Sequence, residues 1–170
     1  VDGFLLSLLW IASFGCYIAG LSSPAMSLIA VALAVSTPFF AGRRLRLFRD
    51  DAREGIISFG RGWAFVVLVF FYAGVVFALA QYAYFAYLDQ GYLVQTMNSM
   101  LSTPEAEQMI AQYDMGDTLS QAMAELNAMR PIDMSLNILT TNIMAGIVIG
   151  VPIAALLKSD VKRTNNQLQA

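Results

Sequence analysis

Four long apolar stretches, each bounded by polar or charged residues, dominate the pattern of the chain. They cover about residues 4–20, 26–42, 63–87 and 134–157. A helix needs about 20 apolar residues to cross a bilayer core of about 30 Å, and each stretch reaches or approaches that length. Lipid offers the backbone no hydrogen-bonding partners, so a single crossing segment of this kind has to be helical. The pattern predicts an all-α integral membrane protein with four transmembrane helices.

The overall composition agrees with lipid as the surrounding solvent. Only 13% of the 170 residues are charged and 58% are hydrophobic, whereas soluble domains have about 25% charged residues. Four crossings use most of the chain. We therefore expect one membrane domain over residues 1–170 and no second globular domain.

The segments between the spans differ strongly in charge. The basic bridge, residues 43–62, holds six arginines against three acids, and the tail, residues 158–170, adds Lys158, Lys162 and Arg163. The connector, residues 88–133, holds seven acids in the range 89–133 against Arg130 alone. Basic segments beside the ends of spans stay in the cytoplasm. We therefore expect a multi-pass protein of the bacterial inner membrane, with both termini cytoplasmic and the connector outside the cytoplasm.

The basic bridge shows its own helical periodicity. An apolar stripe recurs at steps of three or four residues, formed by Leu45, Phe48, Ala52, Ile56 and Phe59. Arg46, Asp50, Arg53 and Glu54 fall on the other side. The pattern predicts a short helix in the cytoplasmic interface, interrupted by the glycines at 55, 60 and 62.

The bridge arginines are the first candidate site. A planar guanidinium pairs with phosphate oxygens through two hydrogen bonds, so Arg46, Arg49 and Arg53 are candidates for binding a lipid headgroup or another lipid phosphate. The alternative is that these residues only set the topology and attract anionic lipids in the ordinary way.

The connector is too long for a simple hairpin, so we expect two or three short helices in it. Helix starts are indicated at Thr103 and Pro104, and at Asp117 after Gly116, while Pro131 marks entry into the last span. Its many methionines indicate either packing onto the spans or a docking surface for another protein.

The last span carries a second candidate site. Asn142, Gly146 and Gly150 share one helix face, and Gly146 and Gly150 have the spacing that lets two helix backbones approach closely. This helix-interface face serves either packing within the bundle or contact with a second subunit.

The sequence offers little for catalysis. It contains no histidine and one cysteine, Cys16, and no cluster of metal ligands or nucleophile beside a base can be recognised. We expect a protein that is not an enzyme, with no cofactor, no catalytic residue and no metal site. The expected partners are membrane lipids and another membrane protein or a second copy, but not nucleic acid.

Several short motifs carry a resemblance to a known family. They are Phe48-Arg49-Asp50-Asp51, the segment 55–60 that reads Gly-Ile-Ile-Ser-Phe-Gly, Tyr87-Leu88-Asp89, and a glycine-bearing last span that ends at Lys158. With them, nearly the whole chain resembles a four-span inner-membrane family of Bacteroidota, catalogued as domain of unknown function 4199. The resemblance implies the fold and the orientation, but no activity. It also associates the chain with gene neighbourhoods that contain a polyprenyl-phosphate glycosyltransferase.

These observations favour a non-catalytic accessory subunit that assembles with an envelope enzyme, such as a polyprenyl-phosphate glycosyltransferase. One alternative is a small lipid or solute transporter or flippase, with a polar path through Gln81, Asn137 and Thr141. Another is an enzyme acting on a lipid phosphate, for which the acids beside the arginines, Asp50, Asp51 and Glu54, would be the candidates.

Overall fold

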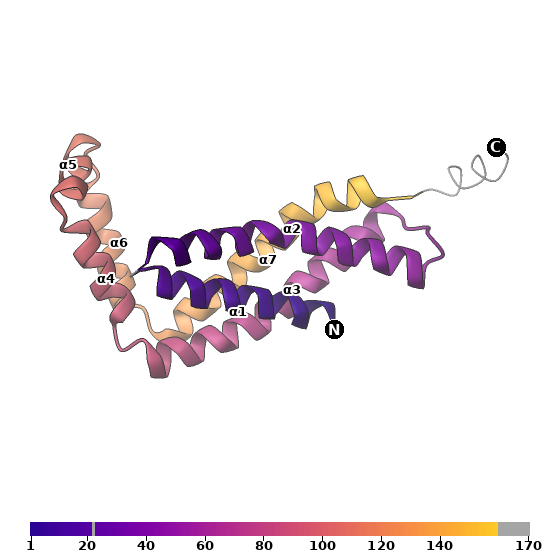
Figure 1. Cartoon of the computed structure of the whole chain (residues 1–170), viewed down its shortest axis with the longest axis horizontal. Coiled ribbons are helices and arrows are strands. Elements are labelled where there is room, and N and C mark those ends of the chain that lie inside the picture. Colours follow the sequence, from indigo (N-terminus) through magenta and orange to yellow (C-terminus); the bar gives the residue numbers. More distant parts are fainter. Residues whose placement is uncertain (22, 160–170) are drawn as a thin grey trace. The chain divides into compact units, whose positions relative to one another are not determined.

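The computed structural model describes residues 1–21 and 23–159, and this part of the chain is built from helices (Figure 1). The elements are α1 (Asp2–Gly20), α2 (Pro24–Ala52), α3 (Phe59–Ala83), the π-helical turn η1 (Tyr84–Leu88), α4 (Tyr92–Leu101), α5 (Pro104–Gln112), α6 (Gly116–Ala128) and α7 (Pro131–Leu157). Helices α1, α2, α3 with η1, and α7 are long and apolar enough to cross a membrane. The predicted all-α class with four spanning helices is confirmed.

The chain divides into two compact units. The first consists of Val1–Leu79 and the part of the chain that begins at Asn137, and the second is Ala80–Leu136. Helices α3 and α7 each pass from one unit into the other. The two units are described separately below. Of the predicted tail, residues 160–170 lie outside the described residues, and so do Lys162 and Arg163.

Helices α1 and α2 form an antiparallel hairpin and lie side by side (Figure 1). Pro24 occupies the first turn of α2, where its missing N–H costs nothing. The Ser27 hydroxyl donates to the carbonyl of Gly20 at 3.0 Å, and the Ser13 hydroxyl donates to the carbonyl of Ala30 at 2.9 Å. These bonds from one helix to the backbone of the other hold the hairpin in register.

The structure corrects the boundary of the basic bridge. Helix α2 continues without a break through the first half of the bridge to Ala52, so the predicted separate interfacial helix does not form. Leu45 is fully buried and the Phe48 ring stacks on Phe65 at 4.5 Å, so the apolar stripe extends the packing face of α2. The helix ends where the backbone turns left-handed at Glu54 and Gly55, with φ values of 51° and 81°.

The core of the first unit is aromatic. The Trp10 ring meets Phe70 and Phe77 edge to face, with ring centroids 5.4 and 5.8 Å apart. Outside the core, large apolar side chains are left uncovered, including Phe39 at 75% and Leu156 at 83% exposed. Contiguous exposure on this scale is unfavourable in water but matches a surface that faces lipid.

Helices α3 and α7 approach closely along the glycine face of α7. A Cβ atom added at Gly146 would lie 2.5 Å from Cβ of Phe70, and one at Gly150 would lie 3.1 Å from Cδ1 of Trp63. The Trp63 indole also donates to the carbonyl of Ile147 at 3.0 Å. The face is therefore packed against α3 of the same chain. This favours bundle packing and leaves these two glycines covered rather than available to a second subunit.

The second unit contains the short helices expected in the connector. Thr103 caps α5 by accepting from the Ala106 N–H at 3.4 Å, and α6 begins at Gly116. The Asp89 carboxylate is 8% exposed and accepts from the N–H groups of Gly91 and Leu93 at 3.2 Å each, so it stabilises the start of α4. The methionine docking surface stays a prediction.

A salt bridge lies at the end of the connector. The Arg130 guanidinium donates to the Asp133 carboxylate at 2.8 and 3.0 Å. This hydrogen bonding raises the pKa of Arg130 above its ordinary value. The single base of the connector is therefore held by a nearby acid.

We predict opposite effects for the same substitution at two helical glycines. Gly146→Ala forces a methyl group against Phe70 and should lower the stability of the bundle by about 1–3 kcal/mol. Gly15→Ala adds a methyl group in open space and should stabilise by about 0.5–1 kcal/mol through helix propensity. Thermal unfolding in detergent, followed by the helical circular dichroism signal, measures both. Equal shifts would contradict the α3–α7 packing described here.

Candidate functional site: a cationic groove between α2 and α7

Polar contacts join the basic bridge to the start of α1 and to the end of α7 at one end of the first unit. Arg44 forms an ion pair with Asp2 at the start of α1, and its Nε lies 2.9 Å from Oδ1 of that aspartate. Arg49 donates to the last carbonyl of α7, that of Leu157, at 3.3 Å. Just beyond, the Ser159 N–H donates to the carbonyl of Ile57 at 3.0 Å. The start of α1, the second half of α2 and the end of α7 therefore lie together.

The arginines of α2 and of the position that follows it divide into engaged and unengaged groups. Arg44 and Arg49 hold the contacts just given, and Arg49 also donates to Asp50 at 2.7 Å. Arg53 lies over the Phe48 ring at 5.8 Å. Arg43 and Arg46 are exposed and form no hydrogen bond or salt bridge with any residue that the structure describes. Their N–H donors are therefore unused within the described chain, although the charge of Arg46 also attracts the nearby Asp50 carboxylate.

A groove of about 840 Å³ lies beside them, between α2 and α7. Its apolar walls include Pro38, Phe39 and Leu47 from α2 and Ile149, Pro152 and Leu156 from α7. Arg43, Arg46 and Asp50 supply its polar lining. Gly42 also lines the groove, and a Cβ there would lie 3.9 Å from the side chains of Ile153 and Leu157, an ordinary van der Waals distance.

The arginines that line the groove are not the same three that the sequence indicated. Of Arg46, Arg49 and Arg53, only Arg46 lines the groove, while Arg49 holds the end of α7 and Arg53 follows the end of α2. Arg43 joins Arg46 instead. Residues three apart on one continuous helix share a face. The sequence interpretation missed this pair because it placed a helix boundary at residue 43.

The arrangement suits a ligand with one anionic and one apolar part. Two guanidinium groups three residues apart can donate several charge-assisted hydrogen bonds to one phosphate group. The groove below them offers hydrocarbon contacts. Among residues 1–21 and 23–159, no group of three His, Cys, Asp or Glu residues lies close enough to hold a metal ion.

The bundle of four long apolar helices, with large side chains exposed along its outer surface, defines a multi-pass helical membrane protein. Within that class, the chain belongs to the family described as protein of unknown function (DUF4199), which it matches over residues 2–159. No curated protein and no solved structure matches the chain.

The engaged and unengaged arginines should differ in their effect on stability. Arg44→Gln removes a partly buried ion pair with Asp2 and should cost about 1 kcal/mol, whereas Arg46→Gln should change the free energy of unfolding by less than about 0.5 kcal/mol. Unfolding in detergent at low and high salt measures this, and the Arg44 effect should shrink with salt. A larger loss for Arg46→Gln would show that Arg46 has a structural partner.

Proposed function

We propose that this protein binds an anionic phosphate lipid in the groove between α2 and α7 and acts as a non-catalytic subunit of an envelope enzyme that handles such lipids. The observation that carries the proposal is the pair of unengaged arginines beside an apolar groove, Arg43 and Arg46. A phosphate lipid has both parts that this site recognises, a charged headgroup and a hydrocarbon tail.

Local charge supports an anion at the mouth of the groove. Asp50 also lines it, but its carboxylate accepts from Arg49 at 2.7 Å. This carboxylate also interacts electrostatically with Arg46, but Arg43, Arg46 and Arg49 together outnumber it. The excess is positive, and a partly dehydrated phosphate group there would be attracted more strongly than in bulk water.

The proposal includes an orientation in the bacterial inner membrane with the basic bridge and both termini in the cytoplasm. The rule that basic segments stay inside supports it. So does the contact between Arg49 and Leu157, because the bridge and the end of the last span then emerge on one side. The groove would accordingly face the inner leaflet.

We propose a subunit rather than an enzyme because of the side chains near the groove. Asp50 is paired with Arg49, while Asp51 and Glu54 are exposed, and none of these acids lies beside a nucleophile that the structure identifies. A site that holds a lipid phosphate without such groups fits presentation of the lipid to an enzyme. The resemblance noted from the sequence suggests a polyprenyl-phosphate glycosyltransferase as that enzyme.

The transporter alternative has less support. Asn137 and Thr141 are exposed, and the Thr141 hydroxyl donates to the carbonyl of Asn137 at 3.0 Å. Neither residue lines the groove between α2 and α7. Two of the three residues expected on a polar path therefore lie on the outer surface of the described chain.

Replacing the unengaged arginines should abolish headgroup selection. We expect the double variant Arg43→Gln, Arg46→Gln to bind phosphatidic acid at least tenfold more weakly, because each charge-assisted hydrogen bond contributes about 1.5–3 kcal/mol. The matched control removes two other charges, Arg53→Gln with Arg61→Gln, and should lose less than about threefold. Native mass spectrometry of protein taken from mixed phosphatidic acid and phosphatidylcholine nanodiscs measures retained lipid. Equal losses in both double variants would show that binding depends only on the net charge of the protein and not on Arg43 and Arg46.

The subunit proposal predicts a companion. A tagged copy purified in mild detergent should carry one stoichiometric membrane enzyme, and the Arg43, Arg46 double variant should retain it because these residues are assigned to lipid. Size-exclusion chromatography with mass spectrometric identification provides the measurement. Elution of the protein alone under conditions that preserve its lipid would remove the subunit role while leaving lipid binding intact.

A further inference from the structure

The groove between α2 and α7 has a definite order of side chains along its length. Helix α2 is unbroken, so the order of its residues in the sequence is also their order along the helix axis. The wall on α2 begins at Pro38 and Phe39. It continues with Arg43 and Arg46, and its last residue is Asp50. A phospholipid has its parts in the same order, first hydrocarbon, then phosphate, then the group esterified to the phosphate.

The Asp50 carboxylate has one oxygen in use. Oδ1 accepts from Nε of Arg49 at 2.7 Å, whereas Oδ2 has no hydrogen bond or salt bridge with any residue that the structure describes. A carboxylate donates no hydrogen bond and accepts up to about four. The side chain is 47% exposed, so a ligand can reach it. Asp50 therefore offers an acceptor at the outer end of the groove.

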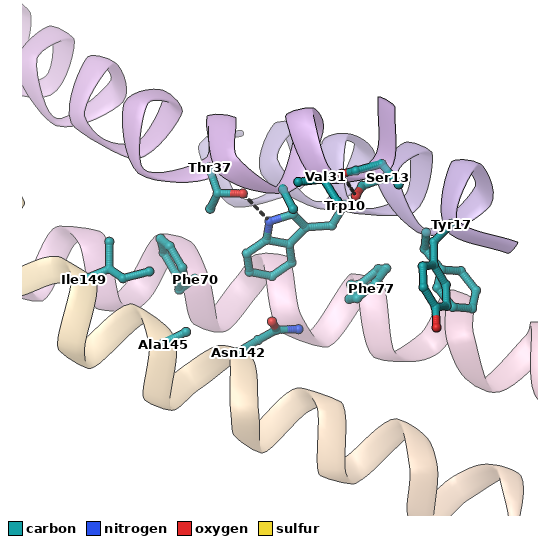
Figure 2. Close-up of a pocket in the computed structure, with 13 residues that line it drawn as sticks. Trp10, Ser13, Tyr17, Val31, Thr37, Phe70, Phe77, Asn142, Ala145 and Ile149 are labelled. Atoms are coloured by element: carbon teal, nitrogen blue, oxygen red, sulfur yellow. Dashed lines mark hydrogen bonds between the residues drawn. The ribbon is translucent and has the colours of Figure 1, made fainter. Parts of the chain in front are cut away.

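A second hollow of the first unit, which we call the aromatic hollow, has a different character (Figure 2). It measures about 410 Å³ and is lined by several rings, including those of Trp10, Phe70 and Phe77. Among the described residues, no charged side chain lines it. Its indole donates to the Thr37 hydroxyl at 3.0 Å, as Figure 2 shows. Of these two hollows, the groove is the one that combines charged side chains with apolar walls.

We propose that Asp50 selects, among anionic phosphate lipids, those whose phosphate is esterified to a group that carries hydroxyls, such as glycerol. The inference rests on the proposed function and names the class of lipid that the groove prefers. The phosphate accepts from Arg43 and Arg46, and a headgroup hydroxyl donates to Oδ2 of Asp50. Asp50 follows Arg46 by four residues, about 6 Å along the helix axis, and a three-carbon headgroup can span that distance.

The charges near the groove favour a neutral donor over an ammonium group. Arg43, Arg46 and Arg49 outnumber the one carboxylate, so a positively charged headgroup is repelled on balance and a hydroxyl is not. A lipid with a phosphate monoester lacks the outer group altogether and leaves Oδ2 of Asp50 unused. A phosphodiester with a hydroxylated headgroup therefore matches the groove along its whole length.

The other role open to Asp50 is to balance the charge of Arg49 and Arg46, both of which attract its carboxylate. The two roles differ in what happens when the carboxylate is removed. Loss of a residue that only balances charge strengthens the binding of every anionic lipid by the same factor. Loss of a hydrogen-bond acceptor changes the ratio between a lipid that has the hydroxyl and one that lacks it.

The test compares phosphatidylglycerol with phosphatidylpropanol, which has the same charge and a three-carbon headgroup without hydroxyls. We expect the parent protein to bind phosphatidylglycerol about tenfold more tightly, because the hydroxyl donates to a charged acceptor. Nanodiscs of phosphatidylcholine that contain both lipids in equal amounts supply the protein. Native mass spectrometry of the released protein then measures the ratio of the two retained lipids.

Two substitutions of neighbouring acids show whether Asp50 sets this ratio. Asp50→Ala removes the acceptor, so the ratio should fall to about one while both lipids bind more tightly. Asp51→Ala is the matched control, because Asp51 is exposed and does not line the groove. It should keep the ratio of the parent protein. A general loss of stability affects both lipids alike, so a merely structural role of the pair formed by Arg49 and Asp50 would leave the ratio unchanged.

Three results would overturn the selection by Asp50. A parent ratio near one, with both lipids retained above phosphatidylcholine, would remove it and leave the proposed lipid binding intact. An undiminished ratio in Asp50→Ala would assign the hydroxyl to another group. Phosphatidylethanolamine retained as strongly as phosphatidylglycerol would show that the site accepts an ammonium group. Retention of neither anionic lipid above phosphatidylcholine would remove the proposed lipid binding and this inference together.

Discussion

The close approach of α3 and α7 is the contact on which the rest of the first unit depends. Lipid tails are as apolar as leucine, so spanning helices gain little by burying apolar surface against each other and rely on close packing instead. Gly146 and Gly150 let Phe70 and Trp63 reach the backbone of α7. This contact fixes α7, and with it one wall of the groove and one wall of the aromatic hollow.

Polar contacts then fix the end of the first unit that carries the basic bridge. Arg49 ties the second half of α2 to the last carbonyl of α7, and Arg44 ties it to Asp2 of α1. In a fold with few polar side chains, those that have partners position the helices, and those without partners are the basis of the proposed ligand site. Arg43 and Arg46 are in the second group, and both line the groove between α2 and α7.

Much of the fold could be predicted because its signals are local. Apolar length identifies the spans, and Pro104, Gly116 and Pro131 mark helix starts without reference to distant residues. The continuity of α2 could not be predicted, because it depends on the stacking of Phe48 with Phe65 from another helix. The acceptor of Arg49 is Leu157, 108 residues away, so the sequence could not separate engaged from unengaged arginines. The glycine spacing likewise indicates a close helix contact but does not name the partner.

The length of α2 gives a reason why its arginines should select a headgroup. Its 29 residues span about 43 Å, whereas a bilayer core is about 30 Å thick, or about 20 residues. If the helix enters the core near Met26, it would leave near Leu45, so Arg43 and Arg46 would flank the edge of the core, where their long side chains can reach the lipid phosphates. The proposed lipid would then keep its phosphate in its own layer and its tail in hydrocarbon. The binding free energy is then not reduced by moving either part into the wrong medium, and the pair of guanidinium groups can discriminate between headgroups.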